Sequence, residues 1–301
     1  MSELLRLFAD NLLPVIFIAG LGFAVRRWLS LDPRAMANVT FYLLVPALVF
    51  FLIYRADIEV SGIVRMAGFA TAIVLAMVLL ALAIARVLHL EAGLASAFIL
   101  SVGFMNAGNF GLAVNRFAFG DAGLAWATVF FLTTSLLTNS VGAYVAAVGR
   151  QPARTALAGL LRIPAVYAVP AALLVRGIGW ELPPAIQRPI ELLAGATIPC
   201  MLILLGMQTA GIRVAGRGGL LALAGGLRLV VAPALAWGLA AALPLTGPAR
   251  QAAILESGMP TAVLASMLAT QYDADPEFVA AAVLFSTVLS PLTLTPLLAA
   301  L

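Results

Sequence analysis

The sequence predicts an all-α integral membrane protein with ten transmembrane helices, arranged as two inverted five-helix repeats in which helices four and nine are broken and cross. Three observations predict this fold. The 301 residues are 63% hydrophobic and only 10% charged, whereas a soluble domain is about half apolar and about a quarter charged. Ten apolar segments are long enough to span a membrane. Two of them, one in each half, are interrupted by polar residues and glycine.

The ten segments follow from length, because a helix that crosses about 30 Å of hydrocarbon needs about 20 residues. In order they are residues 6–28, 35–54, 63–86, 91–118, 121–148, 157–176, 187–210, 217–244, 248–270 and 276–300. The connections are short and polar, and none has room for a soluble domain. The longest connection, residues 149–154, lies at the midpoint of the chain. We therefore expect the two repeats to be residues 1–150 and 151–301.

The two halves resemble each other at an offset of about 150 residues, as expected for internal repeats. At this offset Gly108 matches Gly258, which sets Asn106 against Glu256. Because each half contains an odd number of helices, the halves must enter the membrane in opposite orientations. This arrangement is the inverted repeat of secondary transporters.

The two interruptions are residues 104–111 (FMNAGNFG) and 255–262 (LESGMPTA). A break in a membrane helix leaves backbone groups that hydrocarbon cannot satisfy, so it persists only where it lines a cavity or lies within protein. The alternative is that these asparagines and glycines only serve close helix packing. The candidate substrate-binding residues are Asn106, Gly108, Asn109, Gly258, Met259, Pro260 and Thr261.

Crossing of the two broken helices predicts opposite charge preferences at their inner ends. The second half-helices are expected to begin near Phe110 and Thr261, where N-terminal N–H groups and a partial positive charge suit an anion. Pro260, which lacks an N–H, suits a first helical turn. The carbonyl ends of the first half-helices, together with Glu256, suit a cation such as Na⁺. A mid-membrane carboxylate is costly and therefore indicates function, although a protonated or asparagine-paired structural Glu256 is the alternative.

Other buried polar groups are weaker candidates. The candidate ion-coupling residues are Glu256, Asn106, Thr133 and Thr134. Threonines in membrane helices also bond their own backbone. Arg228 is a candidate contact for an anion, or it extends to the interface as long basic side chains do. Gln208 and Tyr42 are polar candidates of low specificity.

Several classes of function are excluded by composition. Every basic residue except His89 is arginine, so a phosphate-binding loop with lysine is absent. One histidine rules out the usual zinc sites, and the single Cys200 rules out an internal disulfide. Because these motifs are missing, we expect neither an enzyme nor a bound cofactor. We expect no nucleic-acid partner either, because the arginines are scattered as loop and interface anchors. Nine arginines on one predicted side against seven on the other favour an N-terminus outside the cell.

The motifs in both breaks resemble those of a known family. Three stretches resemble those of the auxin efflux carrier family: the run NAGNFG at 106–111, residues 259–265 and the tail 285–293. The similarity covers essentially the whole chain. The chain lacks the long central loop of plant PIN carriers, so it resembles compact bacterial members. The resemblance implies a scaffold domain of the first, second, sixth and seventh helices, a transport domain of the other six, and elevator-like movement. It carries the crossover positions onto Asn109 and Pro260.

Residues 256–259 also resemble the broken helix of sodium-coupled bile-acid symporters, in which a Glu at this place helps bind Na⁺. There Gly-Met is followed by Gln-Asn, whereas here it is followed by Pro260 and Thr261. The auxin efflux carrier family, which the whole chain resembles, includes transporters of malonate, malate and indole-3-acetate. We therefore expect a secondary transporter of small organic anions in a bacterial inner membrane, coupled to Na⁺ or H⁺ or acting as an uncoupled uniporter. A channel-like or sensor protein is a further alternative, and pairing of two copies through the scaffold domain stays open.

Overall fold

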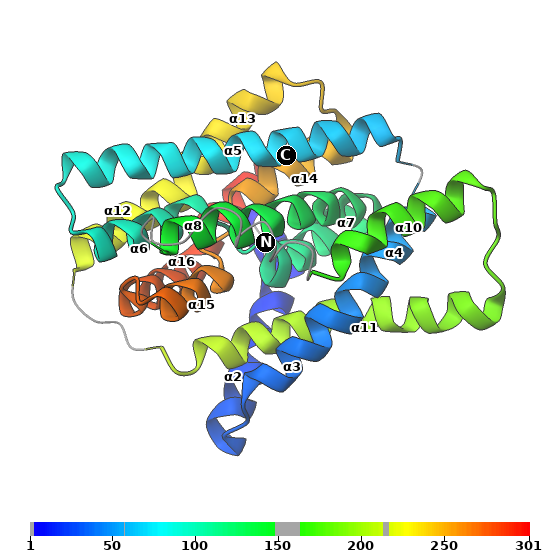
Figure 1. Ribbon diagram of the computed structural model, residues 1–301, viewed down its shortest axis with the longest axis horizontal. Coiled ribbons are helices and arrows are strands. Elements are labelled where there is room, and N and C mark those ends of the chain that lie inside the picture. Colours follow the sequence, from blue (N-terminus) through cyan, green and yellow to red (C-terminus); the bar gives the residue numbers. More distant parts are fainter. Residues whose placement is uncertain (1–2, 57, 148–162, 213–216) are drawn as a thin grey trace.

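The computed structural model describes residues 3–56, 58–147, 163–212 and 217–301, and most of them are helical (Figure 1). The helical segments, with η marking π-helical turns, are α1 (Glu3–Leu7), η1 (Phe8–Leu12), α2 (Leu13–Leu29), α3 (Pro33–Val39), η2 (Thr40–Leu44), α4 (Val45–Arg55), α5 (Val60–Val87), α6 (Ala92–Gly103), η3 (Ala107–Gly111), α7 (Leu112–Leu137), η4 (Thr138–Gly142), α8 (Ala143–Ala146), α10 (Ala165–Gly177), α11 (Pro184–Thr209), α12 (Gly218–Gly226), η5 (Leu227–Val231), α13 (Ala232–Ala242), α14 (Gly247–Ser257), α15 (Val263–Tyr272) and α16 (Pro276–Ala300).

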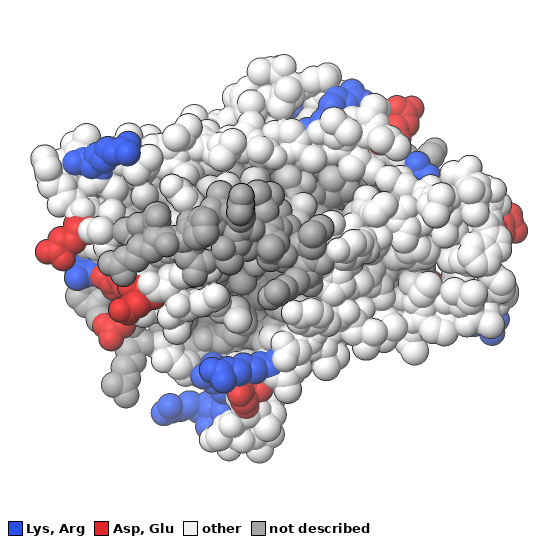
Figure 2. Space-filling view, viewed as in Figure 1, with Lys and Arg blue, Asp and Glu red and all other residues white. Residues whose placement is uncertain are grey.

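The predicted helical membrane protein is confirmed in its broad features. Within the described ranges, seven helices are long and apolar enough to cross a membrane, and α6 and α10 are shorter apolar helices. The same residues form no β-strand, only one isolated bridge. On the face drawn in Figure 2, the charged side chains of the described residues lie near the edges, and the other described residues visible there are uncharged.

One helical span, Ala107–Ala146, has 40 residues, about twice the length that a crossing needs. Gly120 divides it, because its φ of 64° and ψ of −153° lie outside the helical region. Glycine adopts such a conformation without steric cost. The predicted boundary between residues 118 and 121 therefore corresponds to a sharp kink. The predicted connection at 149–154 and the predicted start of a helix at 157 lie outside the described residues.

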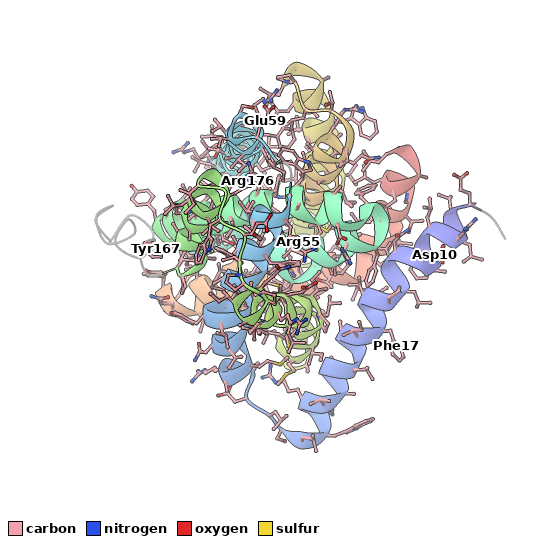
Figure 3. All side chains as sticks on the ribbon, turned by 90° about the vertical axis from the view of Figure 1, so that its right-hand side faces the viewer. Asp10, Phe17, Arg55, Glu59, Tyr167 and Arg176 are labelled. Carbon is pink, nitrogen blue, oxygen red and sulfur yellow. The ribbon has the colours of Figure 1, made fainter. Side chains whose placement is uncertain are left out.

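Helices α2 and α11 pack closely at the lower part of the view in Figure 1. A β-carbon added at Gly22 or Gly206 would overlap the backbone of the opposite helix, so glycine is required at both positions. At the end of this contact, Arg26 Nη1 donates a hydrogen bond to the Met207 carbonyl at 2.5 Å. The other face of α2 carries Phe17, which points away from the other helices and is 65% exposed (Figure 3).

Helices α4 and α10 form a second close pair with a similar end contact. Arg176, at the end of α10, donates to the carbonyls of Ala56 and Ile58, both at 2.6 Å. Basic side chains commonly satisfy carbonyls beyond a helix C-terminus in this way. Arg26 and Arg176 therefore make equivalent contacts in the two halves of the chain.

The predicted limits of both interruptions need correction. Ala107–Gly111 is helical, so the first interruption comprises only residues 104–106. The Gly111 N–H reaches back to the Asn106 carbonyl at 3.0 Å, which closes a wide π-helical turn. In the second half, α14 continues through Ser257 and α15 begins at Val263. Pro260 thus lies within the interruption, not in the first helical turn, and its carbonyl pairs with another segment.

Candidate functional site

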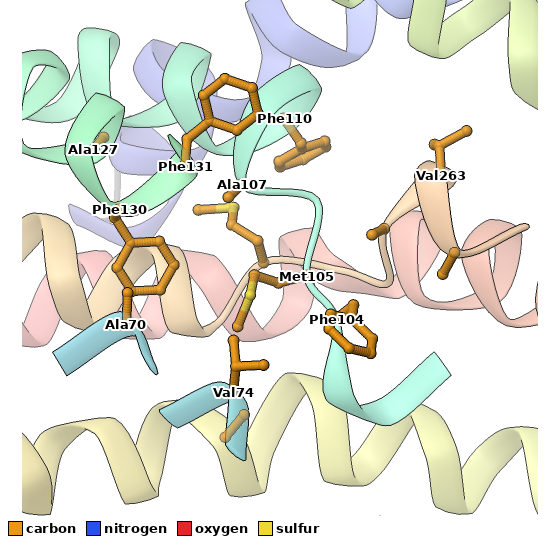
Figure 4. Packing of buried hydrophobic residues seen from close by; sticks show 14 of the residues in the cluster. Ala70, Val74, Phe104, Met105, Ala107, Phe110, Ala127, Phe130, Phe131 and Val263 are labelled. Carbon is orange, nitrogen blue, oxygen red and sulfur yellow. The ribbon is translucent and has the colours of Figure 1, made fainter. Parts of the chain in front are cut away.

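The two interruptions meet and satisfy each other's backbone groups. Met105 and Thr261 form an antiparallel bridge. The Asn106 N–H donates to the Pro260 carbonyl at 2.7 Å, and the Ala262 N–H donates to the Phe104 carbonyl at 3.0 Å. Figure 4 shows the extended segment with Phe104 and Met105 surrounded by apolar side chains. Backbone groups that leave a helix inside a hydrophobic core need such partners.

These reciprocal bonds are exchanged when one half is shifted onto the other by 156 residues (261 − 105), because residue 104 then matches residue 260 and residue 106 matches residue 262. Ser101 and Ser257 follow the same offset, and each hydroxyl donates to the carbonyl four residues earlier. This offset pairs Asn106 with Ala262, whereas the sequence match had predicted that Asn106 pairs with Glu256. The match was wrong here because the glycines at 108 and 258 occupy different places, one inside a helix and the other in the interruption.

A cavity of about 70 Å³ lies beside the joined interruptions. Its lining residues, none of them charged, are Phe41, Met105, Asn106, Ala107, Gly108, Asn109, Phe131, Thr134, Ser135, Thr138, Gln208, Ala262, Val263, Leu264 and Met267. Pockets for drug-sized ligands measure about 300–1,000 Å³, and one water needs about 10–15 Å³. The described conformation therefore accommodates a few waters or part of a compact ligand.

The cavity lies at the N-terminal ends of two helices. Its lining includes the first residues of the helix that begins at Ala107 and of α15, which begins at Val263. The first N–H groups of a helix have no intrahelical partner, and they carry a partial positive charge. The buried amide Nδ2 of Asn106 also lacks a hydrogen-bond partner. Unpaired donors at two helix N-termini, without a charged side chain, suit a small anion.

Side chains from other predicted spans complete the cavity. Phe41 comes from η2 and Gln208 from α11. Asn109 Nδ2 donates to Gln208 Oε1 at 3.5 Å, a long hydrogen bond. An added β-carbon at Gly108 would lie 2.6 Å from the Phe131 ring, so a larger residue there would displace that ring. Phe41 had no distinguishing signal in the sequence, since phenylalanines are frequent throughout the chain.

Glu256 lies outside the cavity lining and is fully buried. Its Oε1 accepts a hydrogen bond from Asn115 Nδ2 at 2.9 Å, and its Oε2 has no partner. Asn115 Nδ2 also donates to the Gly111 carbonyl at 2.9 Å. No donor contacts the other side-chain atom of this amide, Asn115 Oδ1. A β-carbon added at Gly111 would overlap the Glu256 carboxyl group. None of the ion pairs among the described residues involves Glu256. Glu256 Oε2 is thus free to carry a proton, and Glu256 Oε2 and Asn115 Oδ1 are both free to coordinate a cation.

Arg228 is also fully buried and does not line the cavity. It donates to the Val102 carbonyl at 2.9 Å and, from Nη2, to the Ser257 carbonyl. These carbonyls belong to the C-terminal turns of α6 and α14. The alternative that Arg228 extends to the membrane interface is therefore wrong.

Comparison with known proteins identifies the family of the chain. A family model described as "Membrane transport protein" matches residues 7–298. The chain belongs to this family. The predicted membership of the auxin efflux carrier family is thereby confirmed. An uncharacterized transporter of Methanothermobacter thermautotrophicus is 28% identical over 293 residues, or 95% of each chain. An uncharacterized transporter of Methanocaldococcus jannaschii is 26% identical over 195 residues, or 63% of each chain.

The remaining predicted residues of this membrane transport protein divide into two groups. Thr134 lines the cavity, although its hydroxyl donates to the Phe131 carbonyl of its own helix at 3.0 Å. Thr133 lies outside the lining, and its hydroxyl donates to the Val129 carbonyl at 2.9 Å. Tyr42 is exposed.

The second interruption contributes less to the cavity than predicted. Gly258, Met259, Pro260 and Thr261 are all absent from the lining, whereas Ala262 belongs to it. Thr261 instead joins the two halves, because its hydroxyl donates to the Ser101 carbonyl at 2.8 Å. The sequence also gave no reason to select Asn115, which lies one turn beyond the predicted break.

Proposed function

We propose that this transport protein is a secondary active transporter of small organic anions, with carboxylates as the substrate class. The observation that carries the proposal is the uncharged cavity at two helix N-termini, which is lined by Asn106, a residue whose amide Nδ2 has no hydrogen-bond partner. Such donors bind a carboxylate without the desolvation cost of a second buried charge. We place the protein in a bacterial inner membrane with its N-terminus outside.

The proposed topology is ten helices in two inverted repeats, residues 1–150 and 151–301, with the fourth and ninth helices crossing at their interruptions. Three observations support it: the constant offset between the bonded interruptions, the equivalent contacts of Arg26 and Arg176, and long-range contacts between connections. The ion pair Arg217–Asp275 joins two connections that this topology puts on one side of the membrane.

The proposed mechanism is elevator-type alternating access, in which a transport domain of helices 3–5 and 8–10 moves against a scaffold of helices 1, 2, 6 and 7. The cavity supports this division, because Phe41 and Gln208 come from scaffold helices and the other lining residues from the transport domain. The bond from Asn109 to Gln208 crosses the boundary and is long, at 3.5 Å. Breaking such a weak hydrogen bond costs little free energy when the transport domain moves.

Coupling is proposed to pass through Glu256, with Asn115 as its partner and H⁺ or Na⁺ as the ion. A buried carboxyl group needs a proton or a cation, and Glu256 Oε2 has no protein donor. The second candidate function is an uncoupled uniporter. The bond from Asn115 favours it, because a structural Glu256 paired with asparagine and outside the cavity lining has no coupling role.

A thermal-shift screen of the purified protein tests the proposal. Malonate, malate, indole-3-acetate and other carboxylates are compared with matched amines and neutral sugars, each with and without Na⁺. A specific ligand at 100 times its Kd stabilises the native state by about 2.7 kcal/mol. We expect saturable stabilisation by at least one carboxylate and by none of the controls. Stabilisation by no carboxylate would contradict the proposal, and continuous conductance in place of saturable flux would indicate a channel.

A further inference from the structure

Arg228 is the largest fully buried side chain of the described residues. It lies in η5, between α12 and α13, within a predicted membrane span. A buried guanidinium cannot lose its proton readily, so the surrounding protein must stabilise its charge. Neither of the two roles predicted for Arg228 accounts for this position, because the side chain reaches neither the cavity nor the surface.

The charge of Arg228 is balanced by helix ends, not by an acid. No described carboxylate lies within ion-pair distance of its nitrogens. Its two acceptors, the carbonyls of Val102 and Ser257, are at the C-terminal turns of α6 and α14. Each helix C-terminus carries a partial negative charge. One guanidinium thus bridges the negative ends of both first half-helices.

These carbonyl ends are the groups that coordinate the ion in cation-coupled transporters with broken helices. Here neighbouring carbonyls are also occupied by protein donors. Ser101 accepts from the Thr261 hydroxyl at 2.8 Å, and Leu255 and Glu256 accept from the N–H groups of residues 258 and 259 at 3.0 and 3.1 Å. Arg228 therefore occupies the oxygen-rich position between the half-helices, and little coordinating capacity remains there for a metal ion.

Resting on the transport function above, we propose that Arg228 is the resident cation of the crossing. Its guanidinium stands permanently where a Na⁺ ion would otherwise bind between the carbonyl ends of α6 and α14. The protein therefore needs no metal ion at these carbonyls to keep the two half-helices together. Glu256 Oε2 and Asn115 Oδ1, which form no hydrogen bond with Arg228, then remain as oxygens without a hydrogen-bond partner that can still take an ion.

The test uses the melting temperature of the purified full-length protein in detergent, in choline, Na⁺ and millimolar guanidinium buffers. The variants are Arg228→Ala, which opens the cation position, and Arg228→Lys, which keeps the charge. Arg65→Ala is the matched control, because Arg65 is exposed and bonds only within its own helix turn, to Ser61. Arg228→Gln serves as the neutral variant of similar length if the alanine variant does not fold.

We expect wild-type stability to be the same in choline, Na⁺ and guanidinium. Arg228→Ala or Arg228→Gln should melt on the order of 10 °C lower in choline, and guanidinium or Na⁺ should restore much of the loss saturably, as a bound ligand does. Arg228→Lys should lie near the wild type, and Arg65→Ala should respond to none of the ions.

Two results would overturn the proposal. The first is an Arg228→Ala protein as stable as the wild type, and the second is a loss of stability that neither Lys nor any cation restores. The readout is melting temperature without substrate, so a failure of the transport function would be seen separately in the carboxylate screen.

Discussion

The contact between Gly111 and Glu256 gives a prediction whose size follows from the geometry. Gly111 is helical, with φ of −64° and ψ of −45°, so alanine fits its backbone without strain. The new β-carbon would overlap the carboxyl group of Glu256, which is fully buried and held by Asn115. Overpacking a core costs about 1–3 kcal/mol, here at the upper end. Alanine recovers about 1 kcal/mol through helix propensity. The net loss for Gly111→Ala is therefore about 2 kcal/mol.

The assay is thermal unfolding of the purified variants. A loss of about 2 kcal/mol lowers the melting temperature by roughly 4–8 °C. Gly68→Ala is the matched control, because Gly68 lies in α5 and no heavy atom comes within 4 Å of an added β-carbon. That variant should melt at or slightly above the wild-type temperature. In a double-mutant cycle, Glu256→Ala should cost less in the Gly111→Ala protein than in the wild type, since it removes the overlap. Equal stability of the two glycine variants, or strict additivity in the cycle, would refute the reasoning.

Three further predictions concern the joined interruptions. Asn109→Ala should strongly lower uptake into proteoliposomes while the protein stays folded and inserted, because Asn109 lines the cavity and bonds Gln208 on its other wall; normal uptake kinetics would contradict this role. If wild-type transport depends on Na⁺ or on a pH gradient, Glu256→Gln should abolish that dependence, because it keeps the size and removes the charge; flux assays with imposed gradients decide it, and unchanged dependence would exclude Glu256 as the coupling residue. Thr261→Val should lower stability by about 1–3 kcal/mol, because it leaves the Ser101 carbonyl without its donor; a wild-type melting temperature would show that the bond is not needed.

The sequence predicted where the two helices are interrupted, because membrane chemistry penalises broken helices so strongly. Residues 104–106 and 258–262 are interrupted and bonded to each other, and Asn106, Gly108 and Asn109 line one cavity. A polar, glycine-containing run in an apolar span is visible without any structure. The ends of the half-helices were less predictable, because π-helical turns such as Ala107–Gly111 depend on local hydrogen bonding and not on composition.

The contacts around Arg228 and Asn115 were not predictable in the same way. Arg228 binds carbonyls of residues 102 and 257, and backbone carbonyls leave no residue-specific trace in a sequence. Asn115 looked like an ordinary polar residue of a helix, although its spacing of four from Gly111 places both on the face that receives Glu256.

The central claim is that the cavity beside the joined interruptions binds a small organic anion, and Asn106 tests it most directly. Asn106 lines the cavity, and its amide Nδ2 is buried without a hydrogen-bond partner. Asn106→Asp keeps the shape and replaces that donor with an acidic group, and Asn106→Ala removes the whole amide group without adding a charge. The measurement is equilibrium binding of the carboxylate that stabilises the wild type most, with the melting temperature as the control for folding. We expect a loss of about tenfold for alanine and of at least about 100-fold for aspartate, because like charges across a binding contact cost several kcal/mol. An aspartate variant that is folded and binds the anion as tightly as the wild type would contradict the claim.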